Sequence, residues 1–484
     1  MLFNSFEFAL FLPVVFLLYW FVFNRSLRAQ NLFVVGASYL FYGWWDWRFL
    51  LLIAFTSLCS YASGLLIGRF RKRRGGERWS RAVNAGNILL NLTILGVFKY
   101  YDFFAASFAE LFGIADYDSL LLRIILPVGI SFFVFQSMSY TIDIYRGQLK
   151  PLGNWCDYLF YLSFFPQLVA GPIVRARDFI PQIRRNPVVV TREMFGTGVF
   201  LILTGLFKKA IISDYISLNF VDRIFDEPLL YSGFECLAGI YGYALQIYCD
   251  FSGYSDMAIG IALLLGFRFP KNFDAPYKSA TITEFWRRWH ISLSSWLRDY
   301  LYISLGGNRK GKLRTYGNLL VTMVLGGLWH GAAIRFILWG TLHGVALALH
   351  KLWMAVVPGA KATGAQMHWW SRAAGVFFTF NLVCLGWLMF RAESMQTVEL
   401  MLHQIFSNFN VPMIPQVIAG YAGVFALIGA GYLLHLMPGC VDRAAQRLVA
   451  NAPLVLQVVM TAAMIWCVMQ IKSSDIQPFI YFQF

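Results

Sequence analysis

The amino-acid sequence predicts an all-α protein that crosses a membrane many times, and three observations carry this prediction. Hydrophobic residues make up 58% of the 484 positions, aromatic residues 18% and charged residues only 13%. A water-soluble globular protein of this size carries a much larger charged fraction. Apolar runs that approach the roughly 20 residues needed to span a bilayer recur along the chain. Finally, basic residues gather in a few of the loops between these runs, as in multi-pass membrane proteins.

Hydropathy divides the chain into about eleven to thirteen membrane segments, including broken or re-entrant ones, within a single integral-membrane domain over residues 1–484. The first run lacks the basic start and the small-residue cleavage site of a signal peptide, so we expect it to remain in the membrane. The expected segments lie near residues 7–23, 31–45, 49–68, 84–105, 121–145, 194–212, 230–249, 252–267, 316–329, 333–350, 373–390, 417–436 and 453–471.

The uneven distribution of the formal net charge of +15 predicts an orientation. Arg25 and Arg28 follow the first run, and a dense basic stretch over residues 69–81 follows the third. The positive-inside rule places both loops in the cytoplasm. Residues 108–119 contain acidic side chains and neither Lys nor Arg, which suits the opposite side. The amino terminus is therefore predicted to face outward.

Residues 158–174 resemble a membrane span, but the loops on both of its sides are basic. A full crossing would place one of these loops outside, against the positive-inside rule. We therefore expect a segment that enters from the cytoplasm, turns at Pro166 or at Gly171 and Pro172, and leaves on the same side. Irregular backbone within a bilayer is tolerated only when it is buried in protein or lines a cavity. A central cavity is thus predicted.

His330 is the most informative residue, because it lies in Leu-Gly-Gly-Leu-Trp-His-Gly (residues 325–331) after a stretch without charged side chains. An ionisable residue at membrane depth is costly and is by default a functional residue. The alternative is a neutral core histidine bonded to a backbone carbonyl. The helical region 316–350, which also contains His343, is the expected catalytic region.

Residues 284–301 form an amphipathic pattern at helical spacing, which predicts an interfacial helix along the membrane surface. His290 falls inside the edge of the apolar half, so we expect its ring to point into the protein. Arg287, Arg288 and Arg298 fall on the polar half, where they either anchor the helix or attract an anionic substrate. A glycine-rich basic loop follows at residues 306–312, and either positive-inside topology or phosphate binding accounts for it.

Four polar residues interrupt the apolar stretch around residue 250: Asp250, Ser252, Tyr254 and Asp256. Buried polar groups need partners, so they either line the predicted cavity or form a structural network. The seven cysteines are scattered without a C-x-x-C pair, and no two histidines have the H-E-x-x-H spacing of a zinc site. The sequence therefore predicts no metal site.

Together these segments resemble the membrane-bound O-acyltransferase family, and within it the bacterial alginate O-acetyltransferase subgroup. The resemblance covers nearly the whole chain. The matching segments are LPVGISFFVFQSMSYTIDIYRG from Leu126, FFPQLVAGPIVR from Phe164, YCDFSGYSDMAIG from Tyr248, FRFPKNFDAPY from Phe267, ITEFWRRWHISLSSWLRDYLYISLGGNRKG from Ile282, LGGLWHGA from Leu325, GWLMFRAES from Gly386 and the terminal QPFIYFQF.

The resemblance implies that His330 is the catalytic histidine and that His290 is also required, with Trp329 at the substrate site. His330 would be the general base for acyl transfer, since a neutral imidazole accepts a proton at cellular pH. No cofactor is expected to stay bound. The implied acyl donor is acetyl-CoA from the cytoplasm, whose phosphates Arg287, Arg288 and Arg298 would attract.

The resemblance also implies a location in the bacterial cytoplasmic (inner) membrane. The expected partners are membrane lipid, a periplasmic acetyltransferase resembling SGNH hydrolases, and polysaccharide machinery, with no nucleic acid. The implied acceptor is an exported polysaccharide such as alginate. Peptidoglycan, teichoic acid (for D-alanylation), lipid and protein remain alternative acceptors, while a transporter or a structural scaffold is the alternative to an enzyme.

Overall fold

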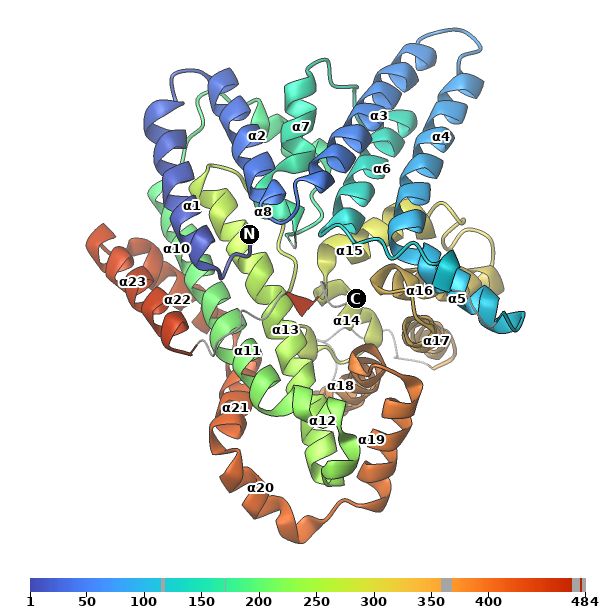
Figure 1. Ribbon diagram of the computed structural model, residues 1–484, viewed down its shortest axis with the longest axis vertical. Helices are drawn as coiled ribbons and strands as arrows, with labels where there is room; N and C mark the ends of the chain where they lie inside the picture. Colours follow the sequence, from blue (N-terminus) through green and yellow to red (C-terminus); the bar gives the residue numbers. More distant parts are fainter. Residues whose placement is uncertain (115–117, 170, 358–367, 472–478, 481–484) are drawn as a thin grey trace. The chain divides into compact units, whose positions relative to one another are not determined.

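The computed structural model describes the 484 residues except 115–117, 170, 358–367, 472–478 and 481–484. Over the described residues, every regular element is a helix, which confirms the all-α prediction (Figure 1). The chain forms two compact units: unit 1 comprises residues 1–202 and 257–270, and unit 2 comprises residues 203–256 and 271–484.

By length and composition, four helices of the described chain can cross a membrane, or six if each of two bent helix pairs counts as one span. The eleven to thirteen membrane segments expected from hydropathy also included short helices and helices that carry polar residues. The four helices are Arg48–Arg71, Glu77–Leu111, Arg192–Asp226 and Trp369–Arg391, and the bent pairs are Val411–Gly420 with Ala422–Leu436 and Gly439–Asn451 with Leu454–Gln470.

Unit 1 is built from helices whose facing sides bury polar groups and whose outer sides are apolar. Its helices are α1 (Phe6–Leu17), α2 (Leu27–Gly43), α3 (Arg48–Arg71), α4 (Glu77–Leu95), α5 (Tyr101–Leu111), α6 (Ile130–Arg146), α7 (Trp155–Ser163), α8 (Phe165–Leu168), α9 (Ala176–Ile183) and most of α10 (Arg192–Leu206).

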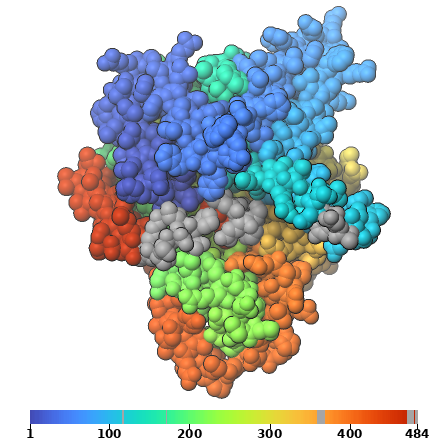
Figure 2. All heavy atoms as spheres, viewed as in Figure 1, coloured from blue at the N-terminus to red at the C-terminus, as the bar shows by residue number. Residues whose placement is uncertain are grey.

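Buried hydrogen bonds join α3, α4 and α6. Ser60 donates to Asn87 Oδ1 at 2.9 Å, and Asn87 Nδ2 donates to Thr141 Oγ1 at 3.0 Å. Such contacts between polar side chains hold helices together where lipid removes the hydrophobic drive to associate. The same unit exposes apolar side chains such as Leu51 and Leu89. Figure 2 shows the first helices of the chain in blue. Unit 1 is therefore a helical assembly suited to contact lipid.

The basic loops of unit 1 lie at one end of it. The turn between α1 and α2, which carries Arg25, and the turn between α3 and α4, which carries Arg73 and Arg74, are at the same end in Figure 1. A common end for both basic turns is what the predicted orientation requires.

The segment expected to be re-entrant is broken and folds back on itself. Helix α7 ends at Ser163, α8 occupies four residues, and residues 172–175 have no regular structure before α9 begins at Ala176. Helices α7 and α9 lie side by side, and the Phe160 and Phe179 rings stack 5.9 Å apart. An ion pair of 2.7 Å between Asp157 and Arg184 joins the two ends of the segment. This is the geometry that entry and exit on one side require.

Unit 2 contains the end of α10 and all later helices, together with π-helical turns. Its helices are α11 (Asp214–Ile216), α12 (Asp222–Asp226), α13 (Gly233–Leu264, up to Asp256), α14 (Ile282–Arg288), α15 (Ile291–Trp296), α16 (Lys312–His330), α17 (Ile334–Val356), α18 (Trp369–Arg391), α19 (Met395–Ser407), α20 (Ile414–Gly420), α21 (Ala422–Leu436), α22 (Gly439–Asn451) and α23 (Leu454–Ile471).

Two sequence predictions about helix boundaries are wrong. The segments 230–249 and 252–267 are one continuous helix, α13, because the polar residues at its centre find partners and do not interrupt the backbone. The continuous helix over residues 284–301 is instead α14, a break at Trp289 and His290, and α15 followed by a π-helical turn. Ser292, two residues after the break, is buried.

Close contact between α10 and α13 within unit 1 gives a test of this packing. A Cβ added at Gly260 would lie 2.6 Å from the Gly198 carbonyl oxygen and 2.9 Å from the Ile202 side chain. We expect Gly260→Ala to lower the free energy of unfolding by about 1–3 kcal/mol, as overpacking does. Thermal unfolding of the purified protein in detergent measures the change. Gly86→Ala is the matched control, because nothing lies within 4 Å of a Cβ there; equal unfolding midpoints for the two variants would contradict the contact.

Candidate active site

His330 is the last residue of α16 and lies inside unit 2, with 5% of its surface exposed. Three aromatic rings surround its imidazole: Trp329 at 4.8 Å, Trp339 at 5.1 Å and Phe390 at 5.2 Å between ring centroids. The last two come from α17 and α18, so the position of His330 depends on three helices. These rings exclude water from the imidazole, as the sequence led us to expect of a histidine in apolar surroundings.

His290 lies at the break between α14 and α15 and is completely buried. Its backbone is left-handed, with φ of +43°, a conformation that non-glycine residues adopt rarely and mostly at turns or functional sites. The Asn272 side chain holds this turn, since its Oδ1 accepts hydrogen bonds from the Ser292 amide at 3.1 Å and the Ser292 hydroxyl at 2.9 Å. The prediction that His290 points into the protein is confirmed.

The same asparagine fixes the proton on the His290 ring. Its Oδ1 lies 3.2 Å from His290 Nδ1, and because the Ser292 amide can only donate, that oxygen is an acceptor. Nδ1 of His290 is therefore the protonated nitrogen, and Nε2 carries the lone pair. His290 lies between α14 and α15, which are both too short to cross a membrane. Burial of its ring lowers the pKa of His290 to about 3. The ring is neutral at physiological pH.

Trp329 links the two histidines. Its ring centroid lies 4.8 Å from that of His330 and 6.3 Å from that of His290. The three residues that the resemblance singled out therefore form one row, although His290 and His330 are 40 positions apart in the sequence. The Phe251 ring of α13 also meets the His290 imidazole edge to face at 4.5 Å.

The polar residues of α13 divide between a buried ion network and the wall of the site. The ammonium group of Lys209 lies 2.6 Å from Asp250 and 2.7 Å from Asp214, and Lys209 and Asp250 are fully buried. Asp256 pairs with Lys208 at 2.6 Å. Of the alternatives left open by the sequence, a structural network describes Asp250 and Asp256.

Ser252 and Tyr254 are also buried, and the Tyr254 ring packs on Phe479 at 4.6 Å. The backbone amide of Ile480 donates to Asp250 Oδ2 at 2.9 Å. Phe479 also contacts Phe251, the ring that covers His290. Most of the terminal QPFIYFQF motif lies outside the described residues, but these two positions belong to the surroundings of the site.

The arginines expected to bind the donor are largely paired within the protein. Arg288 contacts Glu284 at 2.9 Å and Asp274 at 3.6 Å, while Arg298 contacts Asp299 at 2.7 Å. Lys271 also binds Asp274 and is the main reason that the pKa of this carboxyl is lowered. Arg287 is exposed, and no acidic residue of the described chain pairs with it. Among the three, Arg287 is therefore the one available to an anion.

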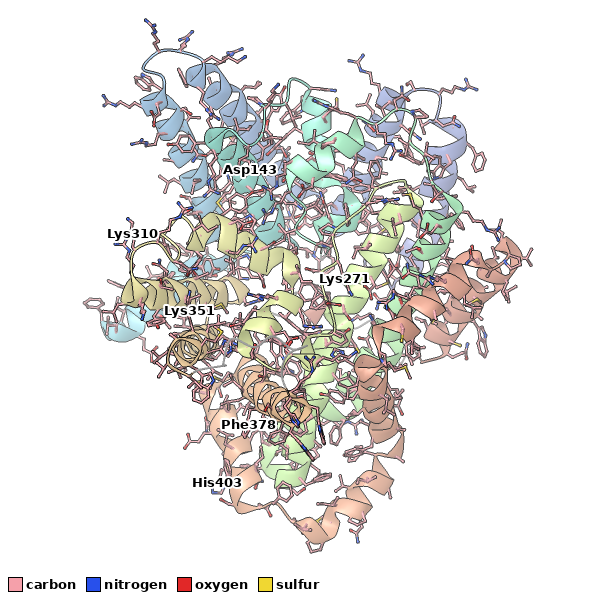
Figure 3. The ribbon with its side chains drawn as sticks, turned by 180° about the vertical axis from the view of Figure 1, so that it is seen from behind. Asp143, Lys271, Lys310, Lys351, Phe378 and His403 are labelled. Carbon is pink, nitrogen blue, oxygen red and sulfur yellow. The ribbon has the colours of Figure 1, made fainter. Side chains whose placement is uncertain are left out.

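The basic loop at residues 306–312 is held by its neighbours. Asn308 Oδ1 accepts from Lys351 of α17 at 2.6 Å and from the Tyr302 hydroxyl at 2.5 Å. Figure 3 shows Lys310 of this loop and Lys351 at the same edge of unit 2. These two hydrogen bonds tie the basic loop to α17 and to the turn that precedes the loop.

Sequence reasoning missed Asn272, Lys209 and Phe251, which organise the site. Asn272 lies in the quoted segment FRFPKNFDAPY, where a polar residue between aromatic ones was a usable signal. Lys209 could have been found as a lysine within an apolar run. Among the described residues, no three His, Cys, Asp or Glu side chains lie close enough together to hold a metal ion.

The helical fold, with several helices long and apolar enough to span a bilayer, is that of a multi-pass membrane protein, and both His290 and His330 are buried in it. Residues 149–396 match the membrane-bound O-acyltransferase family, and the chain belongs to this family of enzymes. Over 402 aligned residues it is 42% identical to the probable alginate O-acetylase AlgI of Pseudomonas aeruginosa. The aligned region covers 82% of this chain and 73% of that protein.

Two further relatives differ in the acceptor that their names state. The peptidoglycan O-acetyltransferase of Helicobacter pylori is 36% identical over 426 residues, covering 82% of this chain and 78% of that protein. The teichoic acid D-alanyltransferase of Streptococcus thermophilus is 30% identical over 284 residues, covering 54% and 68% respectively. The resemblance seen in the sequence is confirmed, and the protein is an O-acyltransferase.

The Lys209 network predicts a loss of stability. Lys209→Met removes the ammonium group and leaves the buried Asp250 and the partly buried Asp214 without their cation. We expect a loss of about 3–5 kcal/mol, as when one partner of a buried ion pair is removed, seen as a lower unfolding midpoint in detergent. Lys208→Met is the control, because its ion pair with Asp256 is partly exposed. Similar midpoints for the two variants would show that the Lys209 network does not stabilise unit 2.

The contact between Asn272 and His290 predicts a loss of activity. Asn272→Ala removes the hydrogen bonds that hold the His290 turn and that keep the proton on His290 Nδ1. We therefore expect the rate of acyl transfer to fall about 100-fold, within the range of a general acid–base contribution. The rate of acyl transfer in membranes, normalised to the amount of folded protein, measures this. Asn219→Ala is the control, since that amide binds a carbonyl of its own helical segment. Full activity of Asn272→Ala would exclude Asn272 as the residue that positions His290.

Proposed function

We propose that the protein transfers an acetyl group from a cytoplasmic thioester, acetyl-CoA, to an exported polysaccharide such as alginate. The row of His290, Trp329 and His330 inside unit 2 is the observation that carries this proposal. The names of the relatives that share 42% identity support acetyl as the group and alginate as the acceptor.

His330 acts as the general base in this proposal. Acyl transfer to a hydroxyl requires a base for the hydroxyl proton and a site with little water, because water would hydrolyse the thioester. The burial of His330 among three aromatic rings supports this role. His290, neutral and with its lone pair on Nε2, helps to place the thioester beside His330 within the predicted cavity.

The donor enters from the basic side of unit 2. Arg287 and the loop at residues 306–312 carry positive charge at the surface, which would attract the phosphates of CoA. This side is cytoplasmic in the orientation predicted from the basic loops, with the amino terminus outside and the protein in the bacterial inner membrane. Only the acetyl group then has to cross, while CoA stays in the cytoplasm.

A periplasmic protein resembling SGNH hydrolases would receive the acetyl group and transfer it to the polymer with the polysaccharide machinery. Peptidoglycan is the second candidate acceptor, since the H. pylori peptidoglycan O-acetyltransferase matches 82% of this chain. The two candidates differ only in which isolated polymer carries the ester.

Acetate released by base from purified envelope polymers tests the proposal. Cells that express the protein should carry ester-linked acetate on an exopolysaccharide such as alginate, and His330→Ala at equal expression should remove nearly all of it, because the hydroxyl is no longer deprotonated. His403→Ala is the matched control, since this histidine is exposed on α19 (Figure 3).

Acetate at the wild-type level in the His330→Ala strain would contradict the role of this histidine as the base. Acetate found on peptidoglycan alone would show that peptidoglycan, and not alginate, is the acceptor. No change in any envelope polymer when the gene is removed would overturn the proposed function.

A further inference from the structure

Three helices of unit 1 bring arginine side chains to one end of that unit. Arg71 is the last residue of α3, Arg81 lies in the second turn of α4, and Arg146 is the last residue of α6. The three helices pack against one another. All three arginines are exposed, so their charges reach the surface at the same end of these helices.

Hydrogen bonds place two of the arginines at the carboxyl end of α6. Arg71 Nη1 donates to the Ile144 carbonyl oxygen at 2.5 Å. Arg81 Nε donates to the Tyr145 hydroxyl at 3.4 Å. A Cβ added at Gly147 would lie 2.6 Å from Arg71 Nη2, so this glycine leaves the room that the guanidinium occupies. The fold therefore holds both arginines around the end of one helix, although they come from two others.

Positive charge on this surface greatly exceeds negative charge. Glu77 is the one acidic residue between positions 69 and 81, and both side chains of its ion pair with Arg81 are exposed. Such an exposed pair contributes little, so Arg81 can exchange Glu77 for another anion. Asp143, the acidic residue of α6, is buried (Figure 3). The turn between α3 and α4 and the start of α4 add four more exposed basic residues: Lys72, Arg73, Arg74 and Arg78.

Apolar side chains continue from this basic surface along the same helices. Trp79 and Leu89 of α4 and Leu66 of α3 are exposed. Tryptophan is enriched where lipid headgroups meet the hydrocarbon layer. Both α3 and the helix that begins with α4 are long and apolar enough to cross that layer. A ligand that fits this surface is anionic at one end and apolar at the other.

We propose that Arg71, Arg81 and Arg146 form a binding site for the headgroup of an anionic phospholipid. Guanidinium groups bind phosphate oxygens through paired, charge-assisted hydrogen bonds. Basic clusters beside the ends of membrane helices attract anionic lipids. The acyl chains lie along the exposed apolar faces of α3 and α4. The positive-inside rule alone requires only a basic turn, and does not require arginines from three helices to meet.

Lipid binding to the full-length protein in detergent tests this site. Native mass spectrometry measures the affinities for phosphatidylglycerol and for phosphatidylcholine, and we expect the wild type to prefer phosphatidylglycerol. Arg81→Gln combined with Arg146→Gln should weaken phosphatidylglycerol binding about 100-fold, because two charge-assisted hydrogen bonds are lost. This variant keeps the bond from Arg71 to α6. If it does not fold, Arg81→Gln alone, at an exposed position, should weaken binding about tenfold.

Arg25→Gln combined with Arg28→Gln is the matched control. It removes the same charge from the other basic turn of unit 1, where both arginines are also exposed, and should leave the affinity for phosphatidylglycerol unchanged. The unfolding midpoint of each variant without added lipid verifies that it is folded.

Three outcomes would overturn the site. Equal affinity of the wild type for the two lipids would show that the headgroup charge is not recognised. Equal losses in the two double variants would show that the arginines act only through their total charge. Complete displacement of phosphatidylglycerol by inorganic phosphate would show a site for a soluble anion. Because the measurement requires no acyl transfer, its result is independent of the proposed function.

Discussion

The buried ammonium group of Lys209, held between Asp250 and Asp214, is the interaction on which unit 2 depends. The ammonium group neutralises Asp250 at the centre of α13, and this helix continues without a break. The residue after Asp250 is Phe251, whose ring forms one wall around His290. The second oxygen of Asp250 accepts from the Ile480 amide. One ion pair thus links helix continuity, the histidine and the last part of the chain.

The site shows two ways in which a membrane protein surrounds a buried imidazole. Aromatic rings from α16, α17 and α18 enclose His330, whereas His290 donates from Nδ1 to the side-chain oxygen of a single asparagine, Asn272. Enclosure by rings removes water, which would otherwise compete with an acceptor alcohol for the acyl group. Fixed hydrogen bonds select the tautomer, which burial alone cannot do.

The sequence predicted what depends on composition and on local pattern. It predicted an all-helical membrane protein, the apolar surroundings of His330, the inward direction of His290 and the break near Pro166. It failed where partners far along the chain decide the outcome. Residues 284–301 have a clear helical period, yet the Ser292 amide donates to the Asn272 side chain and His290 has a left-handed backbone. Likewise, the charge of Asp250 suggested a helix boundary, since its partner Lys209 lies 41 positions earlier and is not part of the local pattern. No local pattern contains such pairings.

The ion pair between Asp157 and Arg184 has a consequence for biosynthesis. It closes the broken segment into a loop whose two ends stay together. In a re-entrant topology, such a loop would enter the membrane from one side only, and the arginines around it would not be translocated. Moving a single guanidinium through hydrocarbon is strongly unfavourable. An ion pair between the start and the end of a broken segment would therefore favour insertion of the segment as one preformed unit.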